Sequence, residues 1–244
     1  MIVQLKAELL KVRSTRTTIG LVLGMIGLVV LIVVLSGLLS HADGLTSTKD
    51  QLGLISSGGV AVIFSALAGV LLITSEYRYG TIHPTFVFTP RRGRVLSAKL
   101  AAGLLAGLVF GVVGVGLALG IGSLILSARG IPSALSTGQI TLLVFGGLAG
   151  IALRGAFGVG LGAILRNQVA AVIGLLAWDF VVTSLLFGLV PSVGRLMPTT
   201  AVNALMGLKT AHLLSPAAGA AVLVGWTVVL ALAGLVLIQR RDVT

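Results

Sequence analysis

Two long runs of apolar residues, 52–74 and 100–126, contain no charged side chain. A helix needs about 20 mostly apolar residues to cross a bilayer, so each run is long enough to do so. Four further runs bring the number of expected spans to six: 19–39, 140–165, 169–190 and 217–238. Within lipid, a helix satisfies its backbone hydrogen bonds internally. The sequence therefore predicts an all-α polytopic membrane protein, with residues 1–244 forming a single transmembrane domain.

The composition agrees with this class of protein and argues against others. Hydrophobic residues make up 57% of the chain and charged residues only 9%, which is unlike a soluble domain. The formal charge of +11 would suggest nucleic-acid binding in a soluble protein. Here the basic residues lie beside apolar runs, where they set topology and contact anionic lipids. We therefore expect membrane lipids, and no nucleic acid, among the partners.

Motifs for catalysis or cofactor binding are missing from the sequence. There is no cysteine, so disulfides and thiolate metal sites are excluded. No G-x-x-x-x-G-K-[ST] phosphate loop occurs, and the histidines His41, His83 and His212 are isolated from one another. We expect neither an enzyme nor a metal or cofactor site in this chain.

A basic connector, residues 76–99, separates the second and third runs and sets the expected orientation. Its five cations favour the cytoplasmic face under the positive-inside rule: Arg78, Arg91, Arg92, Arg94 and Lys99. With the N-terminus inside, twelve of the 17 Lys and Arg residues are cytoplasmic. Four are external: Lys49, Arg129, Arg195 and Lys209. Both termini are therefore expected in the cytoplasm.

The first 17 residues predict an amphipathic helix that lies along the membrane interface. Ile2, Leu5, Leu9 and Val12 recur at helical spacing. The charged residues that fill the other positions are Lys6, Glu8, Lys11, Arg13 and Arg16. The alternative is a short, frayed cytoplasmic tail. The run at 19–39 that follows is longer than the core of a signal peptide, so we expect an uncleaved span.

Glycines recur at four-residue intervals in the third and fourth spans. This spacing removes side chains from one helix face, so we expect close packing against other helices. The glycines concerned are Gly103, Gly107, Gly111, Gly116, Gly120, Gly146, Gly150, Gly158 and Gly162.

Residues 191–216 are too polar to form a span. We expect short helices there, tucked into the outer leaflet, because irregular backbone at membrane depth is tolerated only when it is buried in protein.

Two charges, Arg154 and Asp179, lie inside expected spans, where a charge costs about 2.5–3.5 kcal/mol. They are equidistant from the polar turn at 166–168, so an antiparallel hairpin would place them at the same depth. We expect a buried ion pair. It can serve as a structural clamp of the hairpin, or one of its charges can line a substrate path or carry a proton.

Three segments together resemble the permeases of type 2 ATP-binding-cassette (ABC) exporters. They are the basic start AELLKVRSTRTT, the connector EYRYGTIHPTFVFTPRRGRVLSAKL, and the hairpin GVGLGAILRNQVAAVIGLLAW followed by LVPSVGRLMPT. The resemblance covers nearly the whole chain, and the connector and hairpin are its specific parts. Where many relatives carry a glutamate near the middle of the fifth span, this chain has Asp179 a turn or more earlier.

The resemblance implies a fold, partners and an activity. The N-terminal stretch would be an interfacial elbow helix, the connector would hold a coupling helix, and residues 191–216 would form re-entrant outer helices. The family works as a dimer of permeases with two ATPases, so ATP and Mg²⁺ would be bound by a partner ABC-type ATPase subunit. The chain would then export an amphiphile, such as a drug, lipid or peptide, across the plasma membrane, the inner membrane of a prokaryote.

Coupling to that ATPase is expected from six connector residues: Glu76, Tyr77, Arg78, Gly80, Thr81 and His83. Gly80 is expected to end the second helix, and Pro84 and Pro90 prevent one continuous rod. An alternative for Glu76 is a local ion pair with Arg78 or with one of Arg91, Arg92 and Arg94.

Two other functions fit parts of the pattern. A proton-coupled secondary transporter would use Arg154 and Asp179 as a midplane site between two inverted halves. A scaffold protein that transports nothing would need neither the connector nor the intramembrane charges.

Overall fold

The computed structural model describes residues 2–40, 45–82, 91–208 and 210–240. His41, His83, Pro84, Pro90, Lys209 and Arg241 lie outside the described residues. Within the described part the chain is helical and contains no strand. The elements are α1 (Ile2–Ser14), α2 (Arg16–Leu39), α3 (Thr48–Ser56), a 3₁₀ turn (Ser57–Val60), α4 (Ala61–Arg78), α6 (Arg92–Ala128), α7 (Thr137–Leu165), α8 (Gln168–Ala177), a π turn (Trp178–Val182), α9 (Thr183–Leu189), α10 (Pro191–Gly194), α11 (Pro198–Leu205) and α12 (Pro216–Arg240).

Six helical stretches in the described part are long and apolar enough to cross a membrane. They are Arg16–Leu39, Thr48–Arg78, Arg92–Ala128, Thr137–Leu165, Gln168–Leu189 and Pro216–Arg240. The prediction of an all-α chain with six spans is confirmed at the level of helix length and composition.

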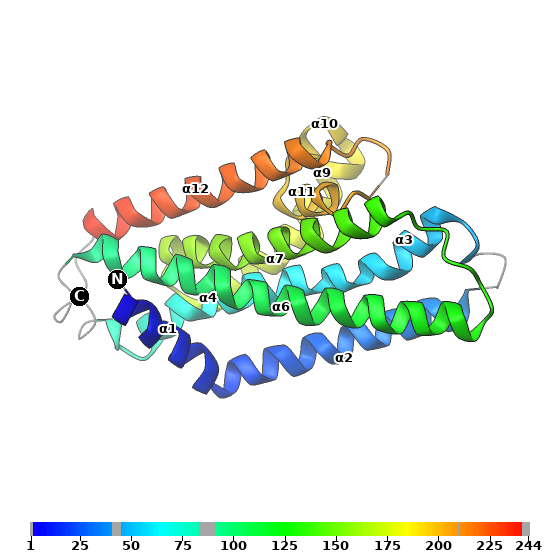
Figure 1. Ribbon diagram of the computed structural model, residues 1–244. Coiled ribbons are helices and arrows are strands. Elements are labelled where there is room, and N and C mark those ends of the chain that lie inside the picture. The colour runs from blue at the N-terminus through cyan, green and yellow to red at the C-terminus, as the bar shows by residue number, and fades with distance from the viewer. Residues whose placement is uncertain (1, 41–44, 83–90, 209, 241–244) are drawn as a thin grey trace.

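The helices form an elongated bundle whose long axis follows the six spans (Figure 1). At its centre α4, α6 and α7 pack against one another, while α2 lies against α6 and α12 against α7. In the most apolar stretch of each span, 56% of the α7 residues are buried, against 17% in α2 and 22% in α12. The outer helices therefore present most of their apolar surface to the surroundings.

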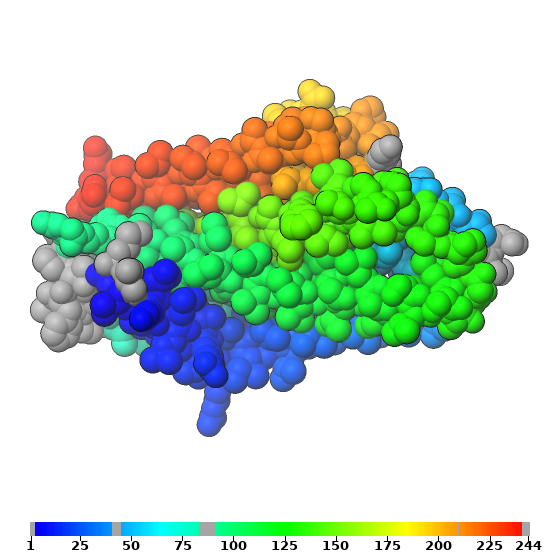
Figure 2. All heavy atoms as spheres, viewed as in Figure 1, coloured from blue at the N-terminus to red at the C-terminus, as the bar shows by residue number. Residues whose placement is uncertain are grey.

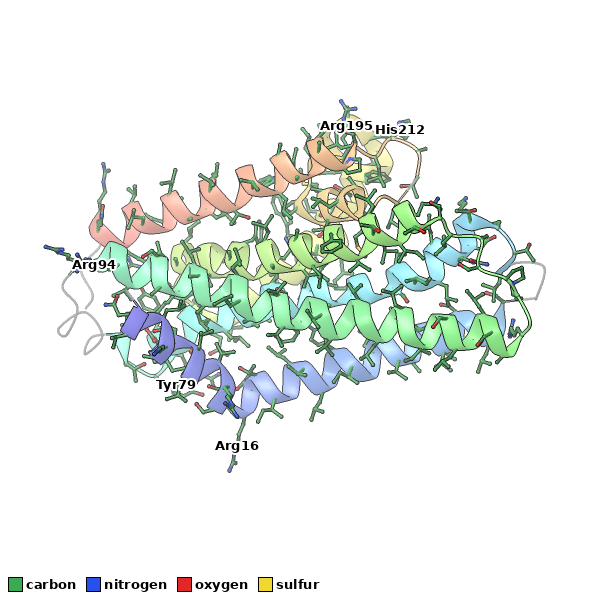
Figure 3. All side chains as sticks on the ribbon, in the orientation of Figure 1. Arg16, Tyr79, Arg94, Arg195 and His212 are labelled. Carbon is green, nitrogen blue, oxygen red and sulfur yellow. The ribbon has the colours of Figure 1, made fainter. Side chains whose placement is uncertain are left out.

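The two ends of the bundle differ in charge. We call the end that carries α1, the start of α6 and the last turn of α12 the basic end, and Figure 1 shows these three elements together. Arg94 projects from this end, whereas Arg195 and His212 lie toward the opposite end (Figure 3). Described cations that cluster at the basic end include Lys6, Lys11, Arg13, Arg16, Arg78, Arg91, Arg92, Arg94, Arg166 and Arg240.

Close glycine contacts hold the three central helices together. A Cβ atom on Gly155 of α7 would lie 2.1 Å from the carbonyl oxygen of Gly103 in α6, and one on Gly69 of α4 would lie 2.0 Å from the Gly155 carbonyl. A Cβ atom on Gly158 would likewise lie 2.1 Å from the Ala66 carbonyl oxygen of α4. Backbones can come this near only where a glycine leaves out the side chain at the contact. The core of the bundle is therefore dense.

The expectation for Gly116 and Gly120 is wrong. Both glycines are exposed, and a Cβ atom on either would meet nothing within 4 Å. They lie on the exposed side of α6, although the adjacent Val115 packs against Gly147 of α7. The spacing rule identified glycines on a helix but could not tell which face of the helix turns inward. Gly103, Gly107, Gly111, Gly146, Gly150, Gly158 and Gly162 all have close neighbours.

A tight polar turn joins α7 to α8. Arg166 adopts a left-handed conformation with φ of 52°, which ends α7. The Asn167 side chain then accepts a hydrogen bond of 3.0 Å from the backbone N–H of Ala170 and caps α8. With so short a turn the two helices run antiparallel, which sets residues equidistant from it side by side.

Two short helices, α10 and α11, occupy the region 191–216 that was expected to hold them. Gly194 of α10 packs directly on the backbone of Phe187, so α10 folds back onto α9. α11 lies between α7 and α12, where Gly146 and Gly219 make room for its backbone. Gly146 is nine residues into α7, so α11 lies about 14 Å along that helix from its start.

Replacing Gly155 by alanine should destabilise the bundle by about 1–3 kcal/mol, the usual cost of overpacking, because the new methyl group meets backbone. The matched variant, Gly116→Ala, should leave stability unchanged or raise it slightly, since alanine favours a helix more than glycine does. Thermal unfolding of detergent-solubilised protein, followed by size-exclusion chromatography, measures both. Equal midpoints for the two variants would contradict the packing described here.

Candidate functional site

Lys99, in α6 near the basic end, is completely buried, with 0% of its surface exposed. Its Nζ atom donates to Glu8 Oε2 of α1 at 2.8 Å and to Glu76 Oε1 of α4 at 2.7 Å. A buried ammonium is strongly unfavourable unless it is paired and hydrogen-bonded. Two carboxylates therefore hold it, and in doing so they join three separate elements.

Lys11 of α1 completes this arrangement. Its Nζ atom lies 3.0 Å from Glu8 Oε1 and 2.7 Å from Glu76 Oε1. We call Glu8, Lys11, Glu76 and Lys99 the charge network. With two acids and two cations it carries no formal net charge, which reduces the cost of burying it.

The charge network makes the Lys11 ammonium harder to deprotonate. Partial burial lowers the pKa of the Lys11 ammonium, but the hydrogen bond to Glu76 and the charges of Glu76 and Glu8 outweigh this effect, so the pKa is raised above 10.5. A raised pKa means that the contribution to stability is complete below pH 10.5 and is lost as the pH rises above that value. Lys11 therefore stays charged throughout the physiological range.

Glu8 reaches the network because α1 packs against α6 with an acidic residue facing inward. Figure 2 shows α1 lying over the part of the bundle next to the basic end. Leu5, Leu9 and Val12 are partly buried on the same side as Glu8. The amphipathic pattern had assigned Glu8 to the polar face, and this assignment is wrong. The buried stripe of α1 is apolar with one acid at its centre, where Lys99 supplies the counter-charge.

Glu76 does not form the local ion pair considered for it. Its Oε1 atom pairs with Lys11 and Lys99 instead of Arg78, Arg91, Arg92 or Arg94. Arg78 instead lies 3.4 Å from Gln168 Oε1. The partners of Glu76 are Lys11 of α1 and Lys99 at the far end of the connector, so sequence proximity was a poor guide to them. The sequence did contain one signal for this pairing, because Lys99 borders an apolar run and is therefore placed to need a counter-charge.

The expected coupling residues divide into two groups. Glu76 is buried and Tyr77 partly buried, with the Tyr77 ring 5.5 Å from the Arg166 guanidinium carbon. Arg78, Gly80 and Thr81 are exposed, as is Tyr79, which lies beside α1 in Figure 3. Gly80 has φ of 70° directly after the end of α4, as expected for a helix stop. His83 lies outside the described residues.

A cleft of about 650 Å³ opens beside the charge network, between α1, α2 and α4. Its wall is mixed in character, because network acids and hydroxyl groups line one part of it and leucines the other. The lining includes Glu8, Lys11, Thr15, Leu21, Leu71, Glu76, Tyr79 and Thr81. The cleft therefore offers both charged and apolar surface to a molecule at the basic end.

The structure also brings together Arg154 and Asp179. Arg154 of α7 is completely buried, and its Nη2 atom donates to Asp179 Oδ2. The second carboxylate oxygen, Oδ1, accepts a hydrogen bond of 2.9 Å from Thr199 Oγ1 of α11. The Phe157 ring packs on the guanidinium at 4.5 Å. Asp179 thus joins the α7–α8 hairpin to the short helix α11.

A π turn sets the direction of Asp179. The turn covers Trp178–Val182, and Oγ1 of Thr183, the next residue, donates to the Trp178 carbonyl at 3.0 Å. Asp179 is buried, whereas Phe180 and Val181 are exposed at 60% and 54%. A π turn rotates the following side chains relative to an α-helix and often occurs at functional sites. Thr199 and the π turn were not anticipated from the sequence.

No metal centre is evident in the described ranges. No group of three or more His, Asp and Glu residues there is arranged to hold a metal ion. The described acids near each other, Glu8 and Glu76, are both bound to lysine.

Replacing Lys99 by methionine should destabilise the protein by about 3–5 kcal/mol, because two buried carboxylates would then share only Lys11. Adding Glu8→Gln to this variant restores charge balance and should recover part of the loss. The matched control is Arg94→Met, which removes a cation from an exposed position of the same helix. Thermal unfolding of the four proteins measures these effects. A Lys99 variant as stable as the Arg94 variant would contradict the role of the network.

Comparison with known proteins adds no identification to these observations. No family model matches the chain, and no curated protein matches it. Any assignment of function therefore depends on the chain's own residues.

Proposed function

We propose that this chain is the permease subunit of an ATP-driven exporter of the type 2 ABC class. It would work with separate ATPase subunits, which bind ATP and Mg²⁺, and with a second permease copy or paralogue. The observation that carries the proposal is the charge network, which joins both helices that flank the connector, α4 and α6, to α1. A protein that docks on the connector would act on all three elements at once.

Helix length supports this mechanical role. α6 has 37 residues and is about 55 Å long, whereas the hydrocarbon core of a bilayer is about 30 Å thick. Its first turns therefore extend beyond the apolar layer toward the connector. Because α6 packs along α7 and α4 through glycine contacts, a displacement at its start is passed into the centre of the bundle.

The charge distribution supports the proposed orientation. The clustering of cations at the basic end favours a cytoplasmic location for that end under the positive-inside rule. Both termini and the connector would then be cytoplasmic in the plasma membrane, and α10 and α11 would form a re-entrant segment on the outer side. α1 would be the interfacial helix.

Exposed apolar surface supports the proposed dimer and the class of substrate. α2, α8–α9 and α12 are the least buried spans, so they can face lipid, a second permease copy or an amphiphile. The cleft beside the charge network combines leucines with charged groups, which suits an amphiphilic substrate such as a drug, lipid or peptide.

A proton-coupled secondary transporter is the second candidate, and one observation favours it. In the described residues, Arg154 Nε and Nη1 are buried without a hydrogen-bond partner. Ionisable residues within membrane spans often mark ion and proton pathways. Exchanging the two charges, as Arg154→Asp with Asp179→Arg, tests this role. Recovered folding without recovered transport would favour a transport role for the pair, whereas recovery of both would make it structural.

The proposed function predicts that the chain, purified mildly from its native membrane, carries an ATPase activity. Arg78→Glu, which reverses an exposed charge at the connector, should lower the co-purified activity about tenfold or more, because a reversed charge at an interface is costly. The matched variant Arg195→Glu, toward the opposite end, should leave it unchanged. Transport into vesicles should require ATP and should persist in the presence of a proton uncoupler.

Three results would contradict the proposal. One is the absence of ATPase activity from every preparation of folded protein. Another is an equal loss of co-purified ATPase activity in the Arg78→Glu and Arg195→Glu variants. The last is transport that ignores ATP and collapses with an uncoupler, which would establish the secondary transporter instead.

A further inference from the structure

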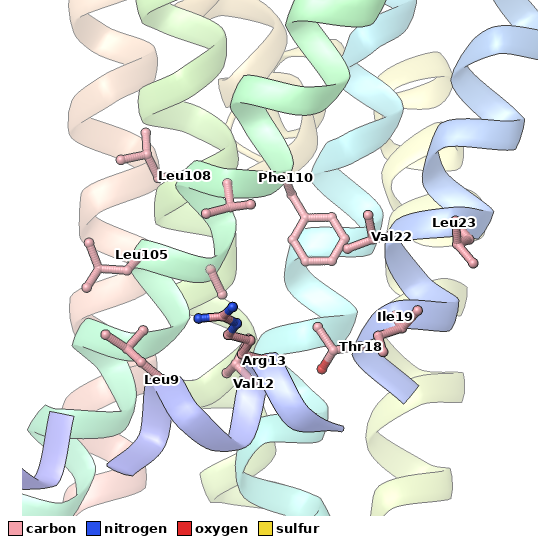
Figure 4. A pocket seen from close by; sticks show the side chains of 12 residues that line it. Leu9, Val12, Arg13, Thr18, Ile19, Val22, Leu23, Leu105, Leu108 and Phe110 are labelled. Atoms are coloured by element: carbon pink, nitrogen blue, oxygen red, sulfur yellow. The ribbon is translucent and has the colours of Figure 1, made fainter. Parts of the chain in front are cut away.

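A second hollow of about 650 Å³ lies on the other side of α1, between α1, α2 and α6. Its lining is almost entirely apolar, and Figure 4 shows Leu105, Leu108 and Phe110 of α6 facing it, with Val22 and Ile19 of α2 opposite. We call it the α1 groove. It is open on one side, and the neighbouring parts of α2 and α6 carry exposed leucines and valines, so it faces lipid.

One charged side chain, Arg13 of α1, enters the α1 groove. Figure 4 shows its guanidinium directed toward α6 among the apolar side chains. The described acids of the basic end, Glu8 and Glu76, already form ion pairs with Lys11 and Lys99. Arg13 is exposed, so its charge is accessible to an anionic lipid headgroup, and the apolar groove beside it suits an acyl chain.

The start of α2 adds to the positive character of this position. Its N-cap residue, Thr15, makes no side-chain cap, and Thr18 of the first turn lines the groove. The Thr18 N–H already donates to the Thr15 carbonyl, but the start of α2 carries the positive end of the helix dipole, which favours a nearby anion. The start of α2 follows Arg13 in the chain by only a few residues.

We propose that the α1 groove binds an anionic phospholipid from the leaflet at the basic end. One acyl chain lies between α2 and α6, and the phosphate is bound by the Arg13 guanidinium beside the start of α2. A guanidinium offers several N–H donors in a planar fork that matches phosphate, and a volume of about 650 Å³ falls within the roughly 300–1,000 Å³ of small-molecule sites. The proposal is independent of the ATPase partner.

The bound lipid would fix the position of α1. α1 is attached to the bundle by the charge network on one side, and the groove lies under its other side, at Leu9, Val12 and Arg13. Filling the groove would give α1 a second contact with α2 and α6. Lipid composition would then affect how firmly α1 stays in place.

Photo-crosslinking of the full chain in nanodiscs tests this site. The probes are phosphatidylglycerol and phosphatidylcholine, each with a photoactivatable group in one acyl chain, and labelled peptides are identified by mass spectrometry. We expect phosphatidylglycerol to label the segments 19–23 and 105–110 more than phosphatidylcholine does. Arg13→Gln should reduce this labelling about tenfold, the effect of one hydrogen bond to a charged group. The matched variant is Arg16→Gln, whose side chain points away from the bundle (Figure 3).

Filling the groove gives a second test that does not depend on charge. Val109→Trp should abolish labelling of both segments by both lipids, because Val109 lines the groove. The matched variant, Val112→Trp, changes a similarly exposed residue that does not line it and should have no effect. Monodisperse size-exclusion profiles establish that each variant is folded.

Several outcomes would overturn the proposal. Equal labelling by the two lipids would show an acyl chain bound without recognition of the headgroup. Equal losses of phosphatidylglycerol labelling in the Arg13→Gln and Arg16→Gln variants would show a general attraction of anionic lipid to the basic end. Labelling by neither lipid, together with cross-links between two copies of the chain at this position, would make the groove a contact between permeases.

Discussion

The position of α1 and of both helices around the connector depends on one buried ammonium group. Lys99 has no access to water, and its two carboxylate partners come from α1 and α4. If α1 moved away, Lys99 would keep only one of those partners and Glu8 would lose its buried counter-charge. Such unpaired buried charges are far less stable than the intact pair. These elements are therefore held as a unit, although each is distant from the others in the sequence.

The bundle beyond this unit contains a rigid centre and a looser outer layer. Glycine contacts allow the backbones of α4, α6 and α7 to approach closely, so movement of one helix moves the others. In the middle of α7, Arg154 pairs with Asp179, which Thr199 in turn connects to α11. Ionic contacts between elements thus fix the basic end and the middle of the core, while α2, α8–α9 and α12 leave apolar surface free.

Much of the architecture follows from the sequence because hydrophobic length and charge alone determine it. The six spans, the break at Gly80 and the juxtaposition of Arg154 with Asp179 across a short turn needed no tertiary information. Three features could not be predicted from the sequence: the burial of the Glu8 side chain, the pairing of Glu76, and the exposure of Gly116 and Gly120. They depend on how each helix is rotated about its axis, which the packing of its neighbours decides. The π turn at Asp179 is likewise a product of packing.

The proposed coupling requires that α1, the end of α4 and the start of α6 move together when a partner acts on the connector. Spin labels at the exposed positions Leu10, Tyr79 and Arg94 can report this by distance measurements on the complex with and without ATP. If the three elements move together, the distances among these three labels stay constant while their distances to a label at Arg195 change. Relative movement of the Leu10 and Arg94 labels, or no change in any distance on addition of ATP, would contradict it.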